Sequence, residues 1–74
     1  MNDNEKRILE ILHSFNEEIP NDIRMNLLAG GYIDSFDIVN IVADIEEIFH
    51  IEIDPEMIVP DNFDTVEHMA RLLK

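Results

Sequence analysis

The feature that most constrains the fold is a set of apolar residues at helical spacing between residues 35 and 49. Such residues recur three or four positions apart, as on one face of an α-helix. The set is Ile38, Ile41, Val42, Ile45, Ile48 and Phe49. Asp34 stands just before it as a predicted N-cap. The pattern predicts an amphipathic helix from Ser35 to Phe49 whose apolar face packs against a core.

Two further segments have the same helical pattern. The first lies near the N-terminus, with Asp3 or Asn4 as the predicted cap. Its apolar face comprises Ile8, Leu9, Ile11, Leu12 and Phe15. The second is predicted from about Thr65 to Leu73, with Asp64 or Thr65 as the cap. Its buried face comprises Val66, Met69, Ala70 and Leu73.

The segments between these helices are less regular. Residues 16–34 predict a long loop with at most one helical turn, held to the core by scattered apolar side chains. Ile51 and Ile53 alternate with acidic residues, but no second strand is available to pair with them, so an extended connection is expected. One or two helical turns are expected after it, broken at Pro60. The chain is therefore predicted to be all-α, a small four-helix bundle of three main helices and one short helix, in a single domain over residues 1–74.

Composition excludes several classes of site. The chain has no cysteine, so it can form neither a disulfide nor a thiolate zinc site. It has no long apolar run and no pattern typical of a signal peptide, so we expect a cytoplasmic protein without a membrane span. Its net charge is -12, and every Lys and Arg lies outside Met25 to Ala70. Such a surface repels nucleic acid and anionic lipid, and it attracts proteins with basic patches.

The second predicted helix places an aromatic residue on its outer side. At about 100° per residue, one group of side chains lies opposite the apolar stripe. This group is Phe36, Asn40, Ala43 and Glu47, with Asp37 and Asp44 at its flanks. An exposed Phe and Ala beside carboxylates are typical of a small docking surface with an apolar centre and a charged rim. The alternative is that Phe36 folds back to cover a loop.

Ser35 at the start of this helix has several possible roles. A serine at a helix start is usually a cap, but Asp34 can fill that role and leave the hydroxyl free. A catalytic serine would need a nearby base. His50 lies at the far end of the helix, roughly 20 Å away at about 1.5 Å per residue, while His13 and His68 belong to other helices. We therefore expect no enzyme activity. We also expect no metal site, because the same histidines lie far apart in the chain.

The segment GYIDSFDIVNIVADIEEIFHIEI resembles the centre of acyl carrier proteins and of the related peptidyl and D-alanyl carrier proteins. DSF at residues 34–36 stands where that family usually has DSL, and TVEHMARLL resembles its last helix. The resemblance spans roughly residues 30–73. It implies an acyl-carrier-type helical bundle in which Ser35, beside the motif residue Asp34, receives 4'-phosphopantetheine from coenzyme A.

The same resemblance implies a carrier rather than an enzyme. Acyl or aminoacyl groups would travel as thioesters on the arm, between enzymes of fatty-acid, polyketide, or amino-acid and D-alanyl pathways. The implied partners are a phosphopantetheinyl transferase, a loading ligase, and synthases or transferases with basic docking patches. The implied docking residues are Phe36, Asp37, Ala43, Asp44 and Glu47. A monomer is expected.

Some residues depart from the family pattern. Asn40 and Ile48 stand where many fatty-acid carriers have acids, and YIDSF is more typical of stand-alone carriers of amino-acid, D-alanyl or specialised pathways. The cargo therefore stays open. The alternative function is a non-carrier acidic helical adaptor in which Ser35 is a helix cap or a phosphorylation site.

Overall fold

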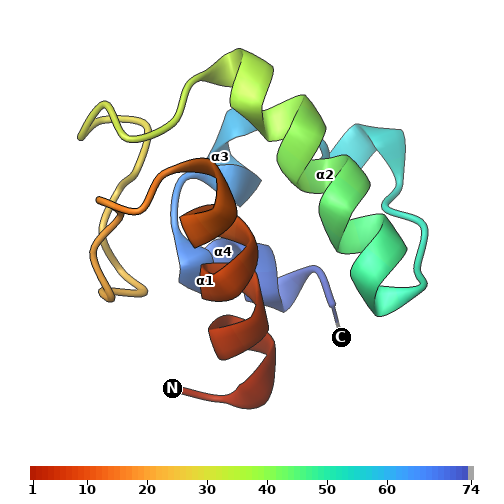
Figure 1. Ribbon diagram of the computed structural model, residues 1–74. Helices are drawn as coiled ribbons and strands as arrows, with labels where there is room; N and C mark the ends of the chain where they lie inside the picture. The colour runs from red at the N-terminus through yellow and green to blue at the C-terminus, as the bar shows by residue number, and fades with distance from the viewer. Residues whose placement is uncertain (74) are drawn as a thin grey trace.

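The computed structural model describes residues 1–73, and it is built from helices joined by loops (Figure 1). These elements are α1 (Asp3–Phe15), α2 (Ser35–Phe49), the 3-10 turn η1 (Pro55–Met57), α3 (Pro60–Phe63) and α4 (Val66–Arg71). No strand occurs in this part of the chain. The prediction of a small all-α bundle is therefore confirmed. None of the described helices is long and apolar enough to cross a bilayer.

The N-cap of α1 lies one residue before Asp3, the earlier of the two predicted caps. The N-cap is Asn2, whose side-chain oxygen accepts a hydrogen bond from the Glu5 backbone N–H at 2.8 Å. The Glu5 carboxylate in turn accepts from the Asn2 backbone N–H at 2.8 Å. This reciprocal capping box satisfies two otherwise unpaired donors at once, so it outcompetes a cap at Asp3 or Asn4.

Helix α2 has the predicted bounds. Its C-cap is His50, which adopts a left-handed conformation with φ of 56°. Near the C-terminus, Thr65 is the cap of α4 and accepts from the His68 N–H at 3.0 Å, but the helix ends at Arg71 rather than Leu73. Pro60 begins α3 instead of breaking a helix, because a first helical position needs no N–H and suits the fixed φ of proline.

The core lies between α1 and its two neighbours α2 and α4, with α3 packed against α2 and α4 (Figure 1). The side chains with no exposed surface are Phe63, Ile8, Leu12, Leu27, Ile41, Ile45, Met69 and Val66. Two residues of the predicted stripes are exposed instead, Phe15 and Ile48. Both lie in the last turn of their helix, where less of the bundle remains to cover them.

The long loop of residues 16–34 is anchored to the start of α4 through its backbone. The Leu27 N–H donates to the Asp64 carbonyl at 2.7 Å, and the Glu67 N–H donates to the Ile23 carbonyl at 2.9 Å. The Leu27 carbonyl accepts from the N–H groups of Tyr32, at 2.9 Å, and Ile33. This part of the chain forms turns but no helix, and it delivers the chain to the start of α2 along a fixed path.

Candidate functional site

The start of α2 is held by two reciprocal aspartates. One carboxylate oxygen of Asp34 accepts from the backbone N–H groups of Phe36 and Asp37, each at 3.0 Å. The Asp37 carboxylate accepts from the Asp34 N–H at 3.0 Å. The predicted cap at Asp34 is confirmed, and Asp37 completes it. Ser35 is therefore the first residue of a helix whose first N–H groups have acceptors without the serine side chain.

The Ser35 hydroxyl differs from the chain's other aliphatic hydroxyl groups. The Ser14 hydroxyl donates to the Ile11 carbonyl at 2.5 Å within α1. The Thr65 hydroxyl is buried and caps α4. Ser35 is exposed, and its hydroxyl makes no hydrogen bond to any group within residues 1–73. It is the hydroxyl that an approaching enzyme can reach without breaking an internal contact.

The two glycines before the site serve different purposes. Gly31 has a φ of 76°, in the left-handed region that only glycine adopts readily. Gly30 has an ordinary φ, but a Cβ there would lie 3.0 Å from the ring of Tyr32 and 3.2 Å from the Asn26 carbonyl oxygen. Both glycines therefore shape the turn that leads to the start of α2.

The outer face of α2 is exposed along its length. Phe36 is 85% exposed, which confirms the prediction and shows that the ring does not fold back over a loop. Asn40, Ala43 and Glu47 are exposed as well. The sequence analysis missed Val39, which is 66% exposed. The helical period could have identified it, because Val39 lies about 40° from Ala43 on the wheel.

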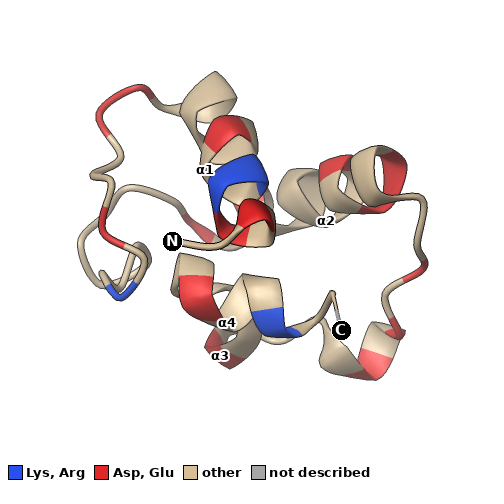
Figure 2. Cartoon of the chain, turned by 90° about the horizontal axis from the view of Figure 1, so that it is seen from below, with Lys and Arg blue, Asp and Glu red and all other residues tan. Residues whose placement is uncertain are grey.

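Apart from Glu47, the acidic residues of α2 lie beside this outer face rather than on it. Asp37 and Asp44 are half-buried, whereas Glu47 is exposed. The Glu46 carboxylate accepts from the Ile53 N–H at 2.8 Å and so holds the chain that leaves the helix. Figure 2 shows the acidic segments of α2 gathered toward its C-terminal end, with the Lys and Arg segments on α1, α4 and the long loop.

The three histidines are separate from Ser35 and from one another. His13 donates through Nε2 to the Ile19 carbonyl at 2.9 Å, and His68 donates through Nδ1 to the Asp64 carboxylate at 2.5 Å. His50 forms the C-terminal end of α2. Within the described residues, no group of three or more His, Asp or Glu side chains could hold a metal ion. Among the described residues, no histidine forms a hydrogen bond with Ser35.

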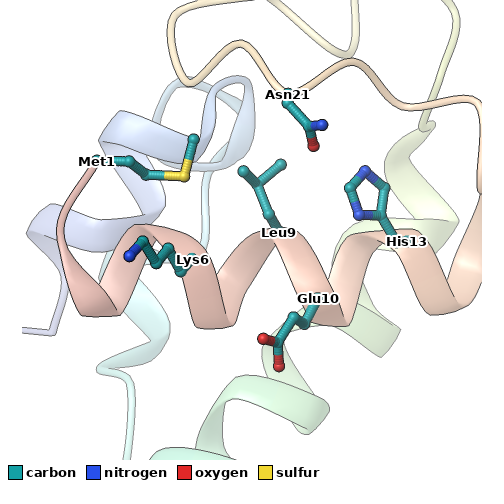
Figure 3. Close-up of a pocket in the computed structure, with 6 residues that line it drawn as sticks. All are labelled: Met1, Lys6, Leu9, Glu10, His13 and Asn21. Carbon is teal, nitrogen blue, oxygen red and sulfur yellow. The ribbon is translucent and has the colours of Figure 1, made fainter.

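A shallow hollow of about 390 Å³ lies beside α1 rather than at the serine (Figure 3). Its lining residues are Met1, Lys6, Leu9, Glu10, His13 and Asn21. Figure 3 shows them on α1 and on the loop that passes over it. None belongs to α2, so this hollow is not part of the surface around Ser35.

Comparison with known protein families identifies the chain. A family model described as a phosphopantetheine attachment site matches residues 6–73. No curated protein and no solved structure matches the chain. Proteins of the matched family carry a covalently attached 4'-phosphopantetheine group, work with partner enzymes and are generally non-catalytic. The chain therefore belongs to the acyl carrier protein family of phosphopantetheine-binding domains.

Proposed function

We propose that Ser35 is the residue to which 4'-phosphopantetheine is attached. The supporting observation is a difference in hydrogen bonding among the chain's aliphatic hydroxyl groups. Those of Ser14 and Thr65 are engaged within helices, whereas that of Ser35 is exposed and unbonded among the described residues. Because Asp34 already caps α2, modifying Ser35 costs the helix no hydrogen bond.

The surroundings of Ser35 are compatible with the phosphodiester that attachment would create. That group is an anion, and the start of a 15-residue helix carries partial positive charge. The carboxylates of Asp34 and Asp37 face backbone N–H groups, which offsets part of their charge at this position. The exposed serine also leaves room for a long, flexible group to extend into solvent.

The attachment reaction needs no base from this chain. The Ser35 oxygen attacks the phosphorus of coenzyme A that bears the pantetheine. A new phosphodiester bond forms, the pyrophosphate bond breaks, and the adenosine bisphosphate leaves. The serine proton passes to the transferase, which also supplies magnesium. When bound, the group supplies a terminal thiol that holds acyl groups as thioesters, which suits a chain that has no cysteine.

We further propose that residues 1–74 form one carrier domain that catalyses nothing itself. It would carry acyl or aminoacyl groups between a loading ligase and synthase or transferase enzymes of fatty-acid, polyketide, or amino-acid and D-alanyl pathways. Phe36, Ala43 and Glu47, with Asp37 and Asp44 at the flanks, would lie in the contact with these enzymes. A cytoplasmic location and a monomeric state stay predictions.

Intact mass spectrometry tests the role of Ser35. The chain is incubated with coenzyme A, magnesium and a broad-specificity phosphopantetheinyl transferase. The wild type and Ser14→Ala should each gain one phosphopantetheinyl group, whereas Ser35→Ala should gain none while keeping its circular dichroism spectrum. If the folded wild type gains no mass, the carrier role is wrong. The acidic adaptor, with Ser35 as a cap or phosphorylation site, then becomes the better interpretation.

A further inference from the structure

The lysine of the described part of the chain lies far from Ser35. The chain has only two lysines, Lys6 and Lys74, and no cysteine. Lys6 precedes Arg7, whose side chain reaches the Ile48 carbonyl at 3.3 Å near the C-terminal end of α2. Ser35 begins the other end of that helix, roughly 20 Å away at about 1.5 Å per residue. Figure 1 shows the start of α1 and the start of α2 at opposite ends of the molecule. Lys74 lies outside the described residues.

The loop that leads to Ser35 contains an arginine and no lysine. The Nε of Arg24 is 3.5 Å from the Glu67 carboxylate. A guanidinium group stays protonated in proteins, so it has no free amine with which to attack a carbonyl carbon. The exposed residues that follow Ser35 in the first turn and a half of α2 have no amine, thiol or imidazole. They are Phe36, Val39 and Asn40.

An amine within reach would destroy an acyl thioester held at Ser35. The amine nitrogen attacks the thioester carbonyl, a C–N bond forms and the C–S bond breaks. The sulfur leaves with the proton that the nitrogen loses. The products are an amide on the chain and a free thiol, so the acyl group is lost to any partner enzyme. A cysteine would take the acyl group in the same way, as a new thioester.

Distance limits this side reaction. The arm of 4'-phosphopantetheine is comparable in length to about four or five residues of extended chain, roughly 15 Å. Ser35 and the end of α2 beside Lys6 are roughly 20 Å apart along the helix axis. Contact would therefore require the arm and the lysine side chain to be almost fully extended toward each other. A tether that spans two groups only when stretched gives a very low effective concentration.

The histidines are the other nucleophiles of the chain. His50 is the C-cap of α2, at the far end from Ser35. His13 donates through Nε2 to the Ile19 carbonyl at 2.9 Å. His68 donates through Nδ1 to the Asp64 carboxylate at 2.5 Å. Both of these rings are half-buried, and each is held by one of its nitrogens, so neither turns freely toward a group on the arm.

We propose that an acyl thioester carried at Ser35 is stable toward its own chain. The Lys6 amine lies beyond the easy reach of the arm, and the loop beside the site has arginine in place of lysine. The acyl group then leaves only to water or to a partner enzyme. This inference rests on the proposed role of Ser35, and it adds a property of the loaded form: the chain does not acylate itself.

The experiment follows the fate of an acetyl group on the full chain. Acetyl-coenzyme A, magnesium and an excess of the broad-specificity transferase attach an acetylated arm, and the enzyme and small molecules are then removed. The protein is held at about pH 8.5, where about one per cent of lysine side chains are deprotonated. Hydroxylamine removes acetyl from a thioester but not from an amide, so intact mass with and without hydroxylamine separates the two. Free acetyl-coenzyme A in the same buffer gives the rate of hydrolysis by water.

A lysine placed near Ser35 is the positive control. Asn40 is exposed and lies about 7.5 Å further along the helix axis. Asn40→Lys should lose its thioester at least about fivefold faster than the wild type and gain hydroxylamine-resistant acetyl at residue 40. Asn40→Arg adds the same charge without a free amine, and it should behave like the wild type. Val39→Lys provides a second position, because Val39 is 66% exposed.

The wild type should lose its acetyl group at a rate within about twofold of that of acetyl-coenzyme A, and should keep none after hydroxylamine. Resistant acetyl on Lys6 or Lys74 would overturn the inference. Thioester loss many times faster than that of acetyl-coenzyme A would also overturn it and would point to a histidine. Lysine variants as stable as the wild type would show that the placement of amines does not protect the thioester.

The loading step separates this inference from the function on which it rests. If the folded wild type never gains the acetylated arm, the role of Ser35 is wrong and the inference falls with it. If the wild type loads and then acylates itself, only the inference is wrong. Circular dichroism of the unloaded variants checks that they fold, which is expected because Val39 and Asn40 are exposed.

Discussion

The guanidinium group of Arg7 lies over the ring of Phe49, with its carbon 4.3 Å from the ring centroid. The same side chain donates from Nη2 to the Ile48 carbonyl at 3.3 Å. Helix α2 has no basic residue in its own last turn. Arg7 of α1 therefore supplies the positive charge that the C-terminal end of a helix favours, and it joins the two longest helices.

Arg7→Ala should lower the free energy of unfolding by about 1 kcal/mol, because it removes a cation–π contact and a hydrogen bond to a helix-end carbonyl. Urea denaturation measures the change. Lys6→Ala is the matched control, since Lys6 is an exposed neighbouring cation outside this contact. Both variants remove one positive charge from an acidic protein. Equal losses would mean that net charge, and not the contact with Phe49, is responsible.

Asp34→Ala should destabilise the chain by about 1 kcal/mol, because two N–H groups at the start of α2 lose their acceptor. Asp34→Asn keeps an oxygen acceptor at the same place and should recover most of that loss. Chemical denaturation of the two variants beside the wild type measures the difference. If the Asp34→Asn variant were as unstable as the Asp34→Ala variant, the charge of Asp34, rather than its capping bonds, would be what stabilises the helix.

The glycines before the site should respond differently to the same change. Gly31→Ala forces an alanine into the left-handed region and should cost about 1 kcal/mol. Gly30→Ala should also destabilise, because the new Cβ meets the Tyr32 ring. Thermal melts of both changes in a Tyr32→Ala background test this distinction. The cost of Gly30→Ala should shrink there, whereas the cost of Gly31→Ala should persist. Equal costs in both backgrounds would contradict the role given to the ring.

Local signals account for much of the fold that the sequence predicts. Asp34 and the apolar period give the start and end of α2, and the same period places Phe36 outside. The cap at Asn2 was missed although Asn2 and Glu5 have capping-box spacing. Asp3 and Asn4 are equally good cap residues by type, and only the reciprocal bonds decide between them.

Other features depend on which segments meet in space. The bond from Leu27 to Asp64 and the contact of Arg7 with Phe49 join positions far apart in the chain. No periodicity in the sequence indicates such pairs. The bond of Asp37 back to the helix cap is local instead, and the three-residue spacing of Asp34 and Asp37 could have indicated it. The free hydroxyl of Ser35 was expected from the cap at Asp34, whereas only the structure shows that the hydroxyl groups of Ser14 and Thr65 are bonded.

Added salt should stabilise the fold. Acidic side chains crowd α2 and the segment after it, whereas the described cations are few, and two of them, Arg24 and Arg71, both pair with Glu67. Screening of this repulsion should raise the melting temperature by several degrees between about 10 mM and about 0.15 M ionic strength, where the Debye length falls to about 8 Å.

A double variant, Glu47→Gln with Glu52→Gln, removes two exposed acids. It should melt higher than the wild type at low salt, with a gain that shrinks as salt is added. A melting temperature that stays flat with salt in both proteins would show that repulsion among these carboxylates does not limit stability.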